Sequence, residues 1–221
     1  MDKQQIGKQI NYCKVTIKVD SESSINAEQI RGFFGYKFLE DGEFHHHGEN
    51  ERYSYPKIQY KYIDKNVILL GLGEYAGILG RKIQNIGNVL IIGKKLRVDS
   101  IKINSGKETI SKSDCNYSFL TPWIALNQHN YRKFKNFTKS EKLAELERIL
   151  VGNILSFAKG FGFFLDFKII VKIISFRTQK IKVNKNEFQA FYLKFNANIS
   201  LPDLIGLGKS ASKGFGVIKR L

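Results

Sequence analysis

Three of the four histidines in this chain of 221 residues stand together in the stretch FHHHGENERYSYPKIQYK, residues 44–61. An imidazole titrates near neutral pH, so histidines at this point could act as general acid and general base. His45 and His47 could also bind a metal ion, but a third ligand is not apparent near them. The third alternative for the triplet is a structural or merely solvated loop.

Lysine and tyrosine side chains follow the histidines at close spacing. Tyr53, Tyr55, Lys57 and Lys61 could stabilise negative charge in a transition state, although each alone is typical of a strand face. Histidine, lysine and tyrosine without paired carboxylates suit RNA cleavage through the RNA's own 2′-hydroxyl group, which DNA lacks. Since no acidic cluster is apparent, two-metal phosphoryl transfer is less attractive, and the sequence predicts no cofactor and no metal.

A second candidate region is the glycine-rich stretch LPDLIGLGKSASKGFGVIKR, residues 201–220. Glycines allow a backbone with positive φ whose amide groups can meet phosphate oxygens, and lysine and serine side chains add donors. The spacing matches neither a P-loop nor a dinucleotide-binding fingerprint. The alternatives are therefore binding of a phosphodiester backbone and a structural turn. The candidate RNA-binding residues are Gly206, Gly208, Lys209, Ser210, Ser212, Lys213, Gly214 and Gly216.

Aromatic and cationic residues also alternate in TPWIALNQHNYRKF, residues 121–134. Such interleaving can stack unpaired bases, with Trp123, Tyr131 and Phe134 as the aromatic members. Trp123 lies in an apolar run, however, which is more typical of a core residue.

The charge of the chain is strongly positive and unevenly distributed. The formal net charge is +16, of which residues 1–114 carry +4 and residues 115–221 carry +12. Part of this excess reflects a composition rich in lysine, but an imbalance confined to one half of the chain favours a polyanionic partner. Nucleic acid is the leading candidate and an anionic membrane surface the second.

Composition also predicts the compartment. The first residues are polar, without the apolar run of a signal peptide, and no stretch reaches the roughly 20 apolar residues that span a bilayer. Cys13 and Cys115 stand in apolar, strand-like stretches, which favours buried free thiols over a disulfide. We therefore expect a cytoplasmic protein.

Hydrophobic periodicity predicts a similar order of elements in each half. The first half reads as strand 11–20, a helix that Asn26 starts, strands 57–63 and 66–72 joined by a turn at 64–65, helix 73–87 and a strand within 88–103. The second half reads as a strand from 115 toward Pro122, a helix over 140–162 that Ser140 can cap, strands 163–183 and 188–201, and a last strand over 214–221.

This order predicts an α+β fold of two tandem ferredoxin-like (RRM-like) βαββαβ domains with antiparallel sheets. The N-terminal domain, 1–110, would carry the histidine loop. The C-terminal domain, 111–221, would carry the glycine-rich loop. We expect the boundary near SGKETISKSD, residues 105–114.

Five stretches, in order along nearly the whole chain, resemble the CRISPR-associated endoribonucleases that process repeat RNA, the Cas-six family of the RAMP superfamily. They are IRGFFGYKF, FHHHGENERYSYPKIQYK, TPWIALNQHNY, ILVGNILSFAKGFG and LPDLIGLGKSASKGFGVIKR. The resemblance implies metal-independent cleavage of the CRISPR precursor transcript within the repeat, with 2′,3′-cyclic phosphate and 5′-hydroxyl ends. It also implies that the glycine-rich loop contacts the RNA backbone.

The resemblance places the general acid–base histidine in the loop after the first helix. A His-x-His pattern in similar members favours His45 and His47 over His46, with His47 the first choice. Tyr36 in the first helix and Lys57 are the matching assisting residues. The partner would be CRISPR repeat RNA, with effector-complex subunits as a further expectation, and the protein would be a monomer or a homodimer that binds no membrane.

Two other functions remain open. A non-catalytic RNA-binding subunit of a CRISPR effector complex would share the fold and the glycine-rich loop, but it would not need the histidine loop. An unrelated basic phosphate-binding domain would share neither the order nor the spacing of the five stretches.

Overall fold

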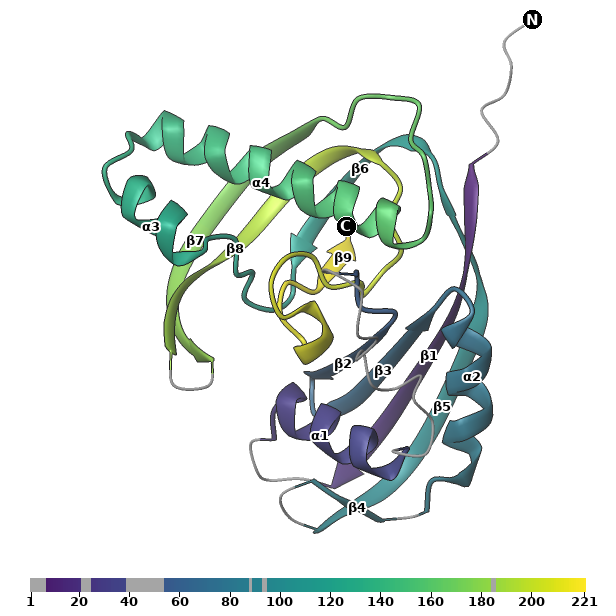
Figure 1. Ribbon diagram of the computed structural model, residues 1–221. Helices are drawn as coiled ribbons and strands as arrows, with labels where there is room; N and C mark the ends of the chain where they lie inside the picture. Colours follow the sequence, from purple (N-terminus) through teal and green to yellow (C-terminus); the bar gives the residue numbers. More distant parts are fainter. Residues whose placement is uncertain (1–6, 21–24, 39–53, 88, 93–94, 184–185) are drawn as a thin grey trace, which may run out of the picture. The chain divides into compact units, whose positions relative to one another are not determined.

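The computed structural model describes residues 7–20, 25–38, 54–87, 89–92, 95–183 and 186–221 (Figure 1). Its contacts divide the chain into two compact units. The N-terminal unit comprises Gln9–Glu108 together with Ser212–Gly214, and the C-terminal unit comprises Met1–Lys8, Thr109–Ala211 and Phe215–Leu221.

The N-terminal unit is built on a five-stranded sheet with the order β2-β3-β1-β5-β4. β1 pairs antiparallel with β3, and β3 pairs antiparallel with β2. The first four strands in this order follow the ferredoxin-like pattern, because each helical connection returns the chain to a non-adjacent strand. The strand bounds are β1 Lys8–Asp20, β2 Ile58–Ile63, β3 Asn66–Leu72, β4 Val89–Ile91 and β5 Lys95–Ile110.

A tight turn fixes the register of the β2–β3 hairpin. Asp64 and Lys65 both have positive φ, 49° and 60°, as a two-residue turn of type I′ requires. Ile63 therefore lies opposite Asn66, and the pairing continues to Ile58 opposite Gly71. The predicted hairpin is confirmed.

Two helices supply the apolar side chains that cover this sheet. α1 (Ala27–Lys37) begins at Asn26, whose side chain forms a capping box with Gln29, and α2 (Tyr75–Lys82) continues into a short 3₁₀ turn at Ile83–Asn85. Both helices pack into one core with the sheet. Its members from β1 and the helices include Cys13, Val15, Ile17, Ile30, Phe34, Ala76, Leu79 and Ile83.

The C-terminal unit repeats the same strand order with four strands, β7-β8-β6-β9. β8 pairs antiparallel with both β6 and β7, and β9 pairs antiparallel with β6. The bounds are β6 Lys112–Phe119, β7 Val171–Val183, β8 Asn186–Ile199 and β9 Ile218–Arg220.

A long helix and an aromatic cluster form the core of this unit. α4 (Lys139–Gly160) buries Leu146, Leu150, Ile154 and Phe157 and lies across the sheet in Figure 1. Trp123 is fully buried, stacks on Phe119 at 5.3 Å between ring centroids, and donates its indole N–H to the Asn153 side-chain oxygen. The expectation that Trp123 is a core residue is confirmed. A shorter helix, α3 (Gln128–Lys135), precedes α4.

The two tandem ferredoxin-like domains expected from the sequence are therefore present, with local differences. Thr138 rather than Ser140 caps α4, because the Thr138 hydroxyl and the Glu141 carboxylate form a reciprocal capping box. The strand expected from residue 163 begins only at Val171. Residues 105–114 are mostly strand, since β5 ends at Ile110 and β6 begins at Lys112, and the division between the two units falls within them, between Glu108 and Thr109.

Two smaller expectations also concern the fold. Cys13 and Cys115 are free and buried, as predicted. Across the described ranges, none of the helices is both long enough and apolar enough to cross a bilayer.

Candidate functional site

The three histidines singled out in the sequence, His45, His46 and His47, lie outside the described residues. The described chain stops at Phe38, directly after α1, and resumes at Ser54, four residues before β2 begins. The sequence order therefore attaches the histidine segment to one end of a helix and the start of a strand in the N-terminal unit.

Tyr36 and Lys57 flank this segment and have different surroundings. Tyr36, near the end of α1, is 78% exposed, so its hydroxyl is accessible. The Lys57 ammonium lies 3.5 Å from a Glu74 carboxylate oxygen and 5.8 Å from the centre of the Tyr75 ring. Lys57 is thus a partly buried cation with an acidic neighbour, whereas Tyr36 is open to solvent.

The N-terminal unit also buries a lysine. Lys61 on β2 is fully buried, and its ammonium nitrogen lies 3.2 Å from the Gln59 side-chain oxygen. The Gln59 amide in turn donates to the Tyr55 hydroxyl at 2.8 Å. Burial lowers the pKa of Lys61 to about 7, so its amine can gain or lose a proton near neutral pH. In the sequence, Gln59 and Lys61 alternate along one strand face, which could have marked them as a pair. The pattern does not reveal that both side chains are buried.

Several residues of the glycine-rich loop have a left-handed backbone conformation. Gly208 and Gly216 have positive φ, 85° and 63°, and so does Ser210 at 61°. A Cβ at Gly216 would lie 2.0 Å from the Leu207 carbonyl oxygen, a distance that no side chain tolerates. Glycine is therefore required at this position by both conformation and space.

Several loop amides are committed inside the protein. Leu207 N–H donates to the Gly216 carbonyl, and Gly216 N–H donates to the Pro122 carbonyl, at 2.8 and 2.9 Å. The apolar side chains of Ile205, Leu207 and Val217 are fully buried. The loop is thus a packed structure, and the chemistry that it exposes lies in side chains such as that of Lys209.

The two loop lysines differ in their partners. Lys209 is exposed, and its ammonium lies 4.4 Å above the Phe188 ring. Lys213, which the contacts group with the N-terminal unit, forms an ion pair with Glu28 of α1. No described carboxylate pairs with Lys209, so its ammonium group is available to an anionic ligand.

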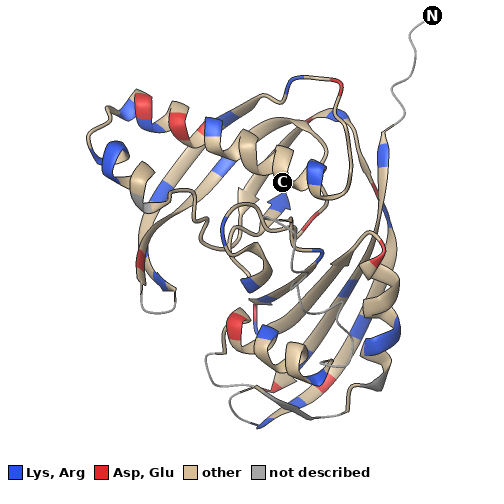
Figure 2. Cartoon of the chain, viewed as in Figure 1, with Lys and Arg blue, Asp and Glu red and all other residues tan. Residues whose placement is uncertain are grey.

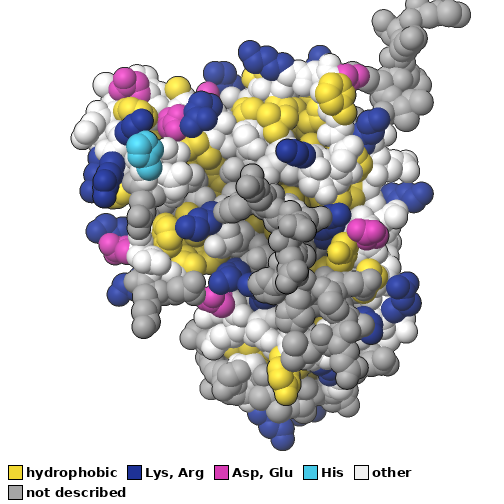
Figure 3. Space-filling view, in the orientation of Figure 1, with side chains coloured by type: hydrophobic (Ala, Val, Ile, Leu, Met, Phe, Trp, Pro, Cys, Tyr) yellow, Lys and Arg dark blue, Asp and Glu magenta, His cyan; other side chains and the backbone are white. Residues whose placement is uncertain are grey.

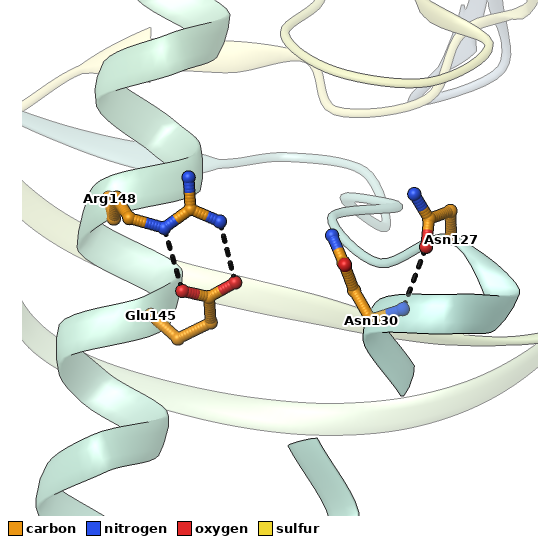
Figure 4. A network of polar contacts seen from close by, with 4 residues as sticks. All are labelled: Asn127, Asn130, Glu145 and Arg148. Atoms are coloured by element: carbon orange, nitrogen blue, oxygen red, sulfur yellow. Dashed lines mark hydrogen bonds and ion pairs between the residues drawn. The ribbon is translucent and has the colours of Figure 1, made fainter. Parts of the chain in front are cut away.

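The structure sorts the aromatic residues of the 121–134 stretch into two groups. Trp123 and Phe134 are buried in the core, whereas Tyr131 is only partly buried and lies on α3. Asn127 caps this helix by accepting the Asn130 N–H at 2.8 Å (Figure 4). Tyr131 is therefore the member of this stretch that can meet a ligand.

Acidic side chains stand among the basic ones on α4 but not on α3. On α4, two hydrogen bonds of 2.7 Å join Arg148 to Glu145 (Figure 4), and they lower the pKa of the Glu145 carboxyl. On α3, none of the described acidic side chains pairs with Arg132, Lys133 or Lys135. Figure 2 shows Lys and Arg recurring along α3 and the β7–β8 hairpin, an arrangement suited to a polyanion.

The described residues offer no metal centre. No group of three or more His, Cys, Asp or Glu side chains with metal-binding geometry occurs among them. The histidine segment lies outside these residues, so the metal-free expectation for it stays a prediction.

Family comparison covers almost the whole chain. The model of the Cas6b N-terminal domain matches residues 8–109, and the model of the Cas6b C-terminal domain matches residues 109–221. An uncharacterized protein of Methanocaldococcus jannaschii, MJ0978, is 32% identical over 145 residues, which cover 65% of this chain and 99% of that protein.

Solved structures show the same fold over the same length. A crystal structure of Cas6b is 27% identical with a TM-score of 0.86, covering 97% of this chain and all of that one. A crystal structure of the CRISPR RNA processing endoribonuclease Cas6b is 24% identical with a TM-score of 0.76 and the same coverage. A Cas6 product complex, at 14% identity and a TM-score of 0.61, covers 96% of this chain and 99% of that one, and shares the fold alone.

Proposed function

Because the chain belongs to the Cas6b family, we propose that it is an endoribonuclease that cleaves CRISPR repeat RNA in the precursor transcript. The observation that carries this proposal is the match of both halves, in order, to the two Cas6b domains. A similar solved structure is named a CRISPR RNA processing endoribonuclease, which supports the activity. The uncompensated lysines and arginines of α3 and the exposed Lys209 support an RNA partner.

The proposed reaction needs no metal ion. A base removes the proton from the 2′-hydroxyl, the 2′-oxygen attacks the adjacent phosphorus, and the bond from phosphorus to the 5′-oxygen breaks. An acid gives the leaving oxygen its proton, so the products carry a 2′,3′-cyclic phosphate and a 5′-hydroxyl. We assign the acid–base role to His47 with His45, because a neutral pKa suits both proton transfers.

The surroundings of Tyr36 and Lys57 are compatible with an assisting role for each. Tyr36 is accessible and can donate a hydrogen bond to a phosphate oxygen. Lys57 can stabilise the charge of the transition state once it leaves Glu74, which holds it at 3.5 Å. The glycine-rich loop binds the RNA backbone through Lys209 and its serine hydroxyls.

A cleavage assay with the cognate repeat RNA in EDTA tests the assignment. We expect His47→Ala to slow single-turnover cleavage by roughly 10²–10⁴-fold, the usual contribution of general acid–base catalysis, with RNA affinity unchanged. His45→Ala should also lose activity, whereas His46→Ala should retain it. His129→Ala is the matched control, because His129 is exposed on α3, away from the histidine segment in the sequence.

Two outcomes would contradict the proposal. Full activity in all three triplet variants would remove these histidines from catalysis. Tight RNA binding by the unmodified protein without any cleavage would favour the alternative, a non-catalytic RNA-binding subunit of a CRISPR effector complex.

A further inference from the structure

A pocket of about 250 Å³ opens in the C-terminal unit between α3 and the end of the β7–β8 hairpin. Pockets that bind drug-sized ligands have volumes of about 300–1,000 Å³. This pocket is slightly smaller, so it suits a single nucleotide unit. The pocket is lined by Leu126, Asn127, Tyr131, Lys135, Lys180, Glu187, Phe188 and Gln189.

The walls of this pocket combine aromatic rings with cations. Lys135 places its ammonium 4.7 Å from the centre of the Tyr131 ring, and Lys209 places its ammonium 4.4 Å from the centre of the Phe188 ring. Each ring therefore has an ammonium group beside it. Because Lys135 lies over the face of the Tyr131 ring, a base that stacks there takes the place of the ammonium group and keeps its own phosphate within reach of that lysine. A stacked base beside a cation is the combination that binds single-stranded nucleic acid.

The polar groups in the wall can meet the edge of a base. Asn127 uses its side-chain oxygen to cap α3, as Figure 4 shows, so its amide N–H₂ group is what remains to donate. Gln189 adds a second carboxamide. The wall is thus more polar than apolar, which suits the polar edge of a base and its phosphate.

Charge and position connect this pocket to the glycine-rich loop. Lys135 and Lys180 outnumber the one acidic residue in the wall, Glu187, which lies 3.8 Å from Lys180. Lys209 of the loop adds a third cation through its contact with Phe188. Figure 3 shows Lys and Arg side chains beside exposed hydrophobic surface on the part of the molecule where Figure 1 places α3.

We propose that the pocket between α3 and the β7–β8 hairpin binds one unpaired nucleotide of the RNA, with its base against Tyr131. Its phosphate then lies between Lys135 and Lys209. This inference rests on the proposed function for the identity of the polymer, but it concerns binding and not cleavage. A duplex cannot enter, because its bases are stacked and paired with each other.

Binding of a fluorescent repeat RNA with a 2′-deoxy nucleotide at the cleaved position tests the pocket. We expect Tyr131→Ala to weaken binding of a single-stranded probe by roughly 10-fold, within the effect of removing one stacked base, and Tyr131→Phe to bind like the unmodified protein. A perfectly paired RNA duplex of the same length should bind both variants equally. Thermal unfolding of Tyr131→Ala shows whether the fold is kept.

A lysine pair on α3 gives a second, milder comparison. Lys135→Ala should weaken single-strand binding severalfold, whereas Lys133→Ala, an exposed lysine on the same helix that does not line the pocket, should have less effect. Equal losses of single-strand affinity in Lys135→Ala and Lys133→Ala would overturn the proposed pocket. So would a Tyr131→Ala variant that loses as much affinity for the duplex as for the single strand.

The two proposals fail in different ways. If the unmodified protein binds the single strand but cleaves no repeat RNA, the proposed function fails. The single-strand affinity of Tyr131→Ala then still tests the pocket. If the protein cleaves and Tyr131→Ala binds as tightly as the unmodified protein, the pocket alone is wrong.

Discussion

The two ferredoxin-like units share a strand order but differ in the connection that leads to the last strand of that pattern. In the N-terminal unit, α2 and the 3₁₀ turn at Ile83–Asn85 make this connection after β3. After β8 of the C-terminal unit, residues 200–217 make it, and their only helical element in the described chain is a 3₁₀ turn, Ala211–Lys213. The contacts group Ser212–Gly214 of this connection with the N-terminal unit.

Both connections bury apolar side chains, and the loop also exposes a charged one. The helical connection adds Ala76, Leu79 and Ile83 to the core of its unit. The loop buries Ile205, Leu207 and Val217 in the same manner, but it also carries Lys209 on its outside. A glycine-containing loop can therefore supply buried apolar side chains where the other unit uses a helix, and also carry an exposed cation.

Gly216→Ala is expected to have the largest effect on the stability of this loop. Its Cβ would lie 2.0 Å from the Leu207 carbonyl oxygen, and its φ is 63°. We expect a loss of about 3 kcal/mol or more in the free energy of unfolding, because the backbone must move to remove the clash. Chemical denaturation measures the loss.

Gly162→Ala is the matched control for that substitution. Gly162 has a similar φ of 68°, but an added Cβ meets nothing within 4 Å. Only the backbone strain remains, so the expected cost is about 1 kcal/mol. Equal costs at the two positions would mean that the loop is not packed as described.

Lys61 should make the stability of the N-terminal unit depend on pH. Its pKa is lowered to about 7 in the folded protein, from about 10.4 in an unfolded chain. Between these values the unfolded chain binds a proton that the folded protein does not, so stability rises with pH through this window. We expect a gain of roughly 2 kcal/mol between pH 7 and pH 9.

Lys61→Met should abolish this gain, since no buried amine is left to titrate. Lys102→Met, at an exposed position of β5, should keep it. The measurement is the free energy of unfolding of each variant at several pH values. An unchanged pH dependence in Lys61→Met would show that Lys61 is not buried in solution.

Of these substitutions, Lys209→Ala should have the smallest effect. It tests whether the glycine-rich loop binds RNA. Removing one phosphate contact lowers the slope of log affinity against log salt concentration by about 1. Lys172→Ala is the control, because Lys172 already pairs with Glu147 at 3.4 Å. Identical salt slopes for Lys209→Ala and the unmodified protein would make the loop purely structural.

The fold could be predicted from the sequence because local patterns and turn chemistry agree. Alternation at Cys13, Val15 and Ile17 marks β1, and the Asp64–Lys65 turn fixes the β2–β3 hairpin. The end of a strand is harder to predict, as the late start of β7 at Val171 shows, because pairing partners decide it and apolar residues alone do not.

The candidate site could be predicted only in part. The types and spacing of the glycines and lysines identified the loop, but its internal hydrogen bonds from Leu207 and Gly216 depend on contacts with distant residues. The burial of Lys61 and the pocket beside Tyr131 also arise from residues far apart in the sequence. The histidine segment lies outside the described residues, so its role rests on chemistry and on family membership.

The most direct test of the central claim is cleavage of the repeat RNA with a single 2′-deoxy nucleotide at the scissile position, in the presence of EDTA. We expect the all-RNA substrate to be cut, leaving a 2′,3′-cyclic phosphate end, and the substituted substrate to bind equally well and stay intact. Cleavage of the substituted substrate at the same position would contradict attack by the 2′-hydroxyl.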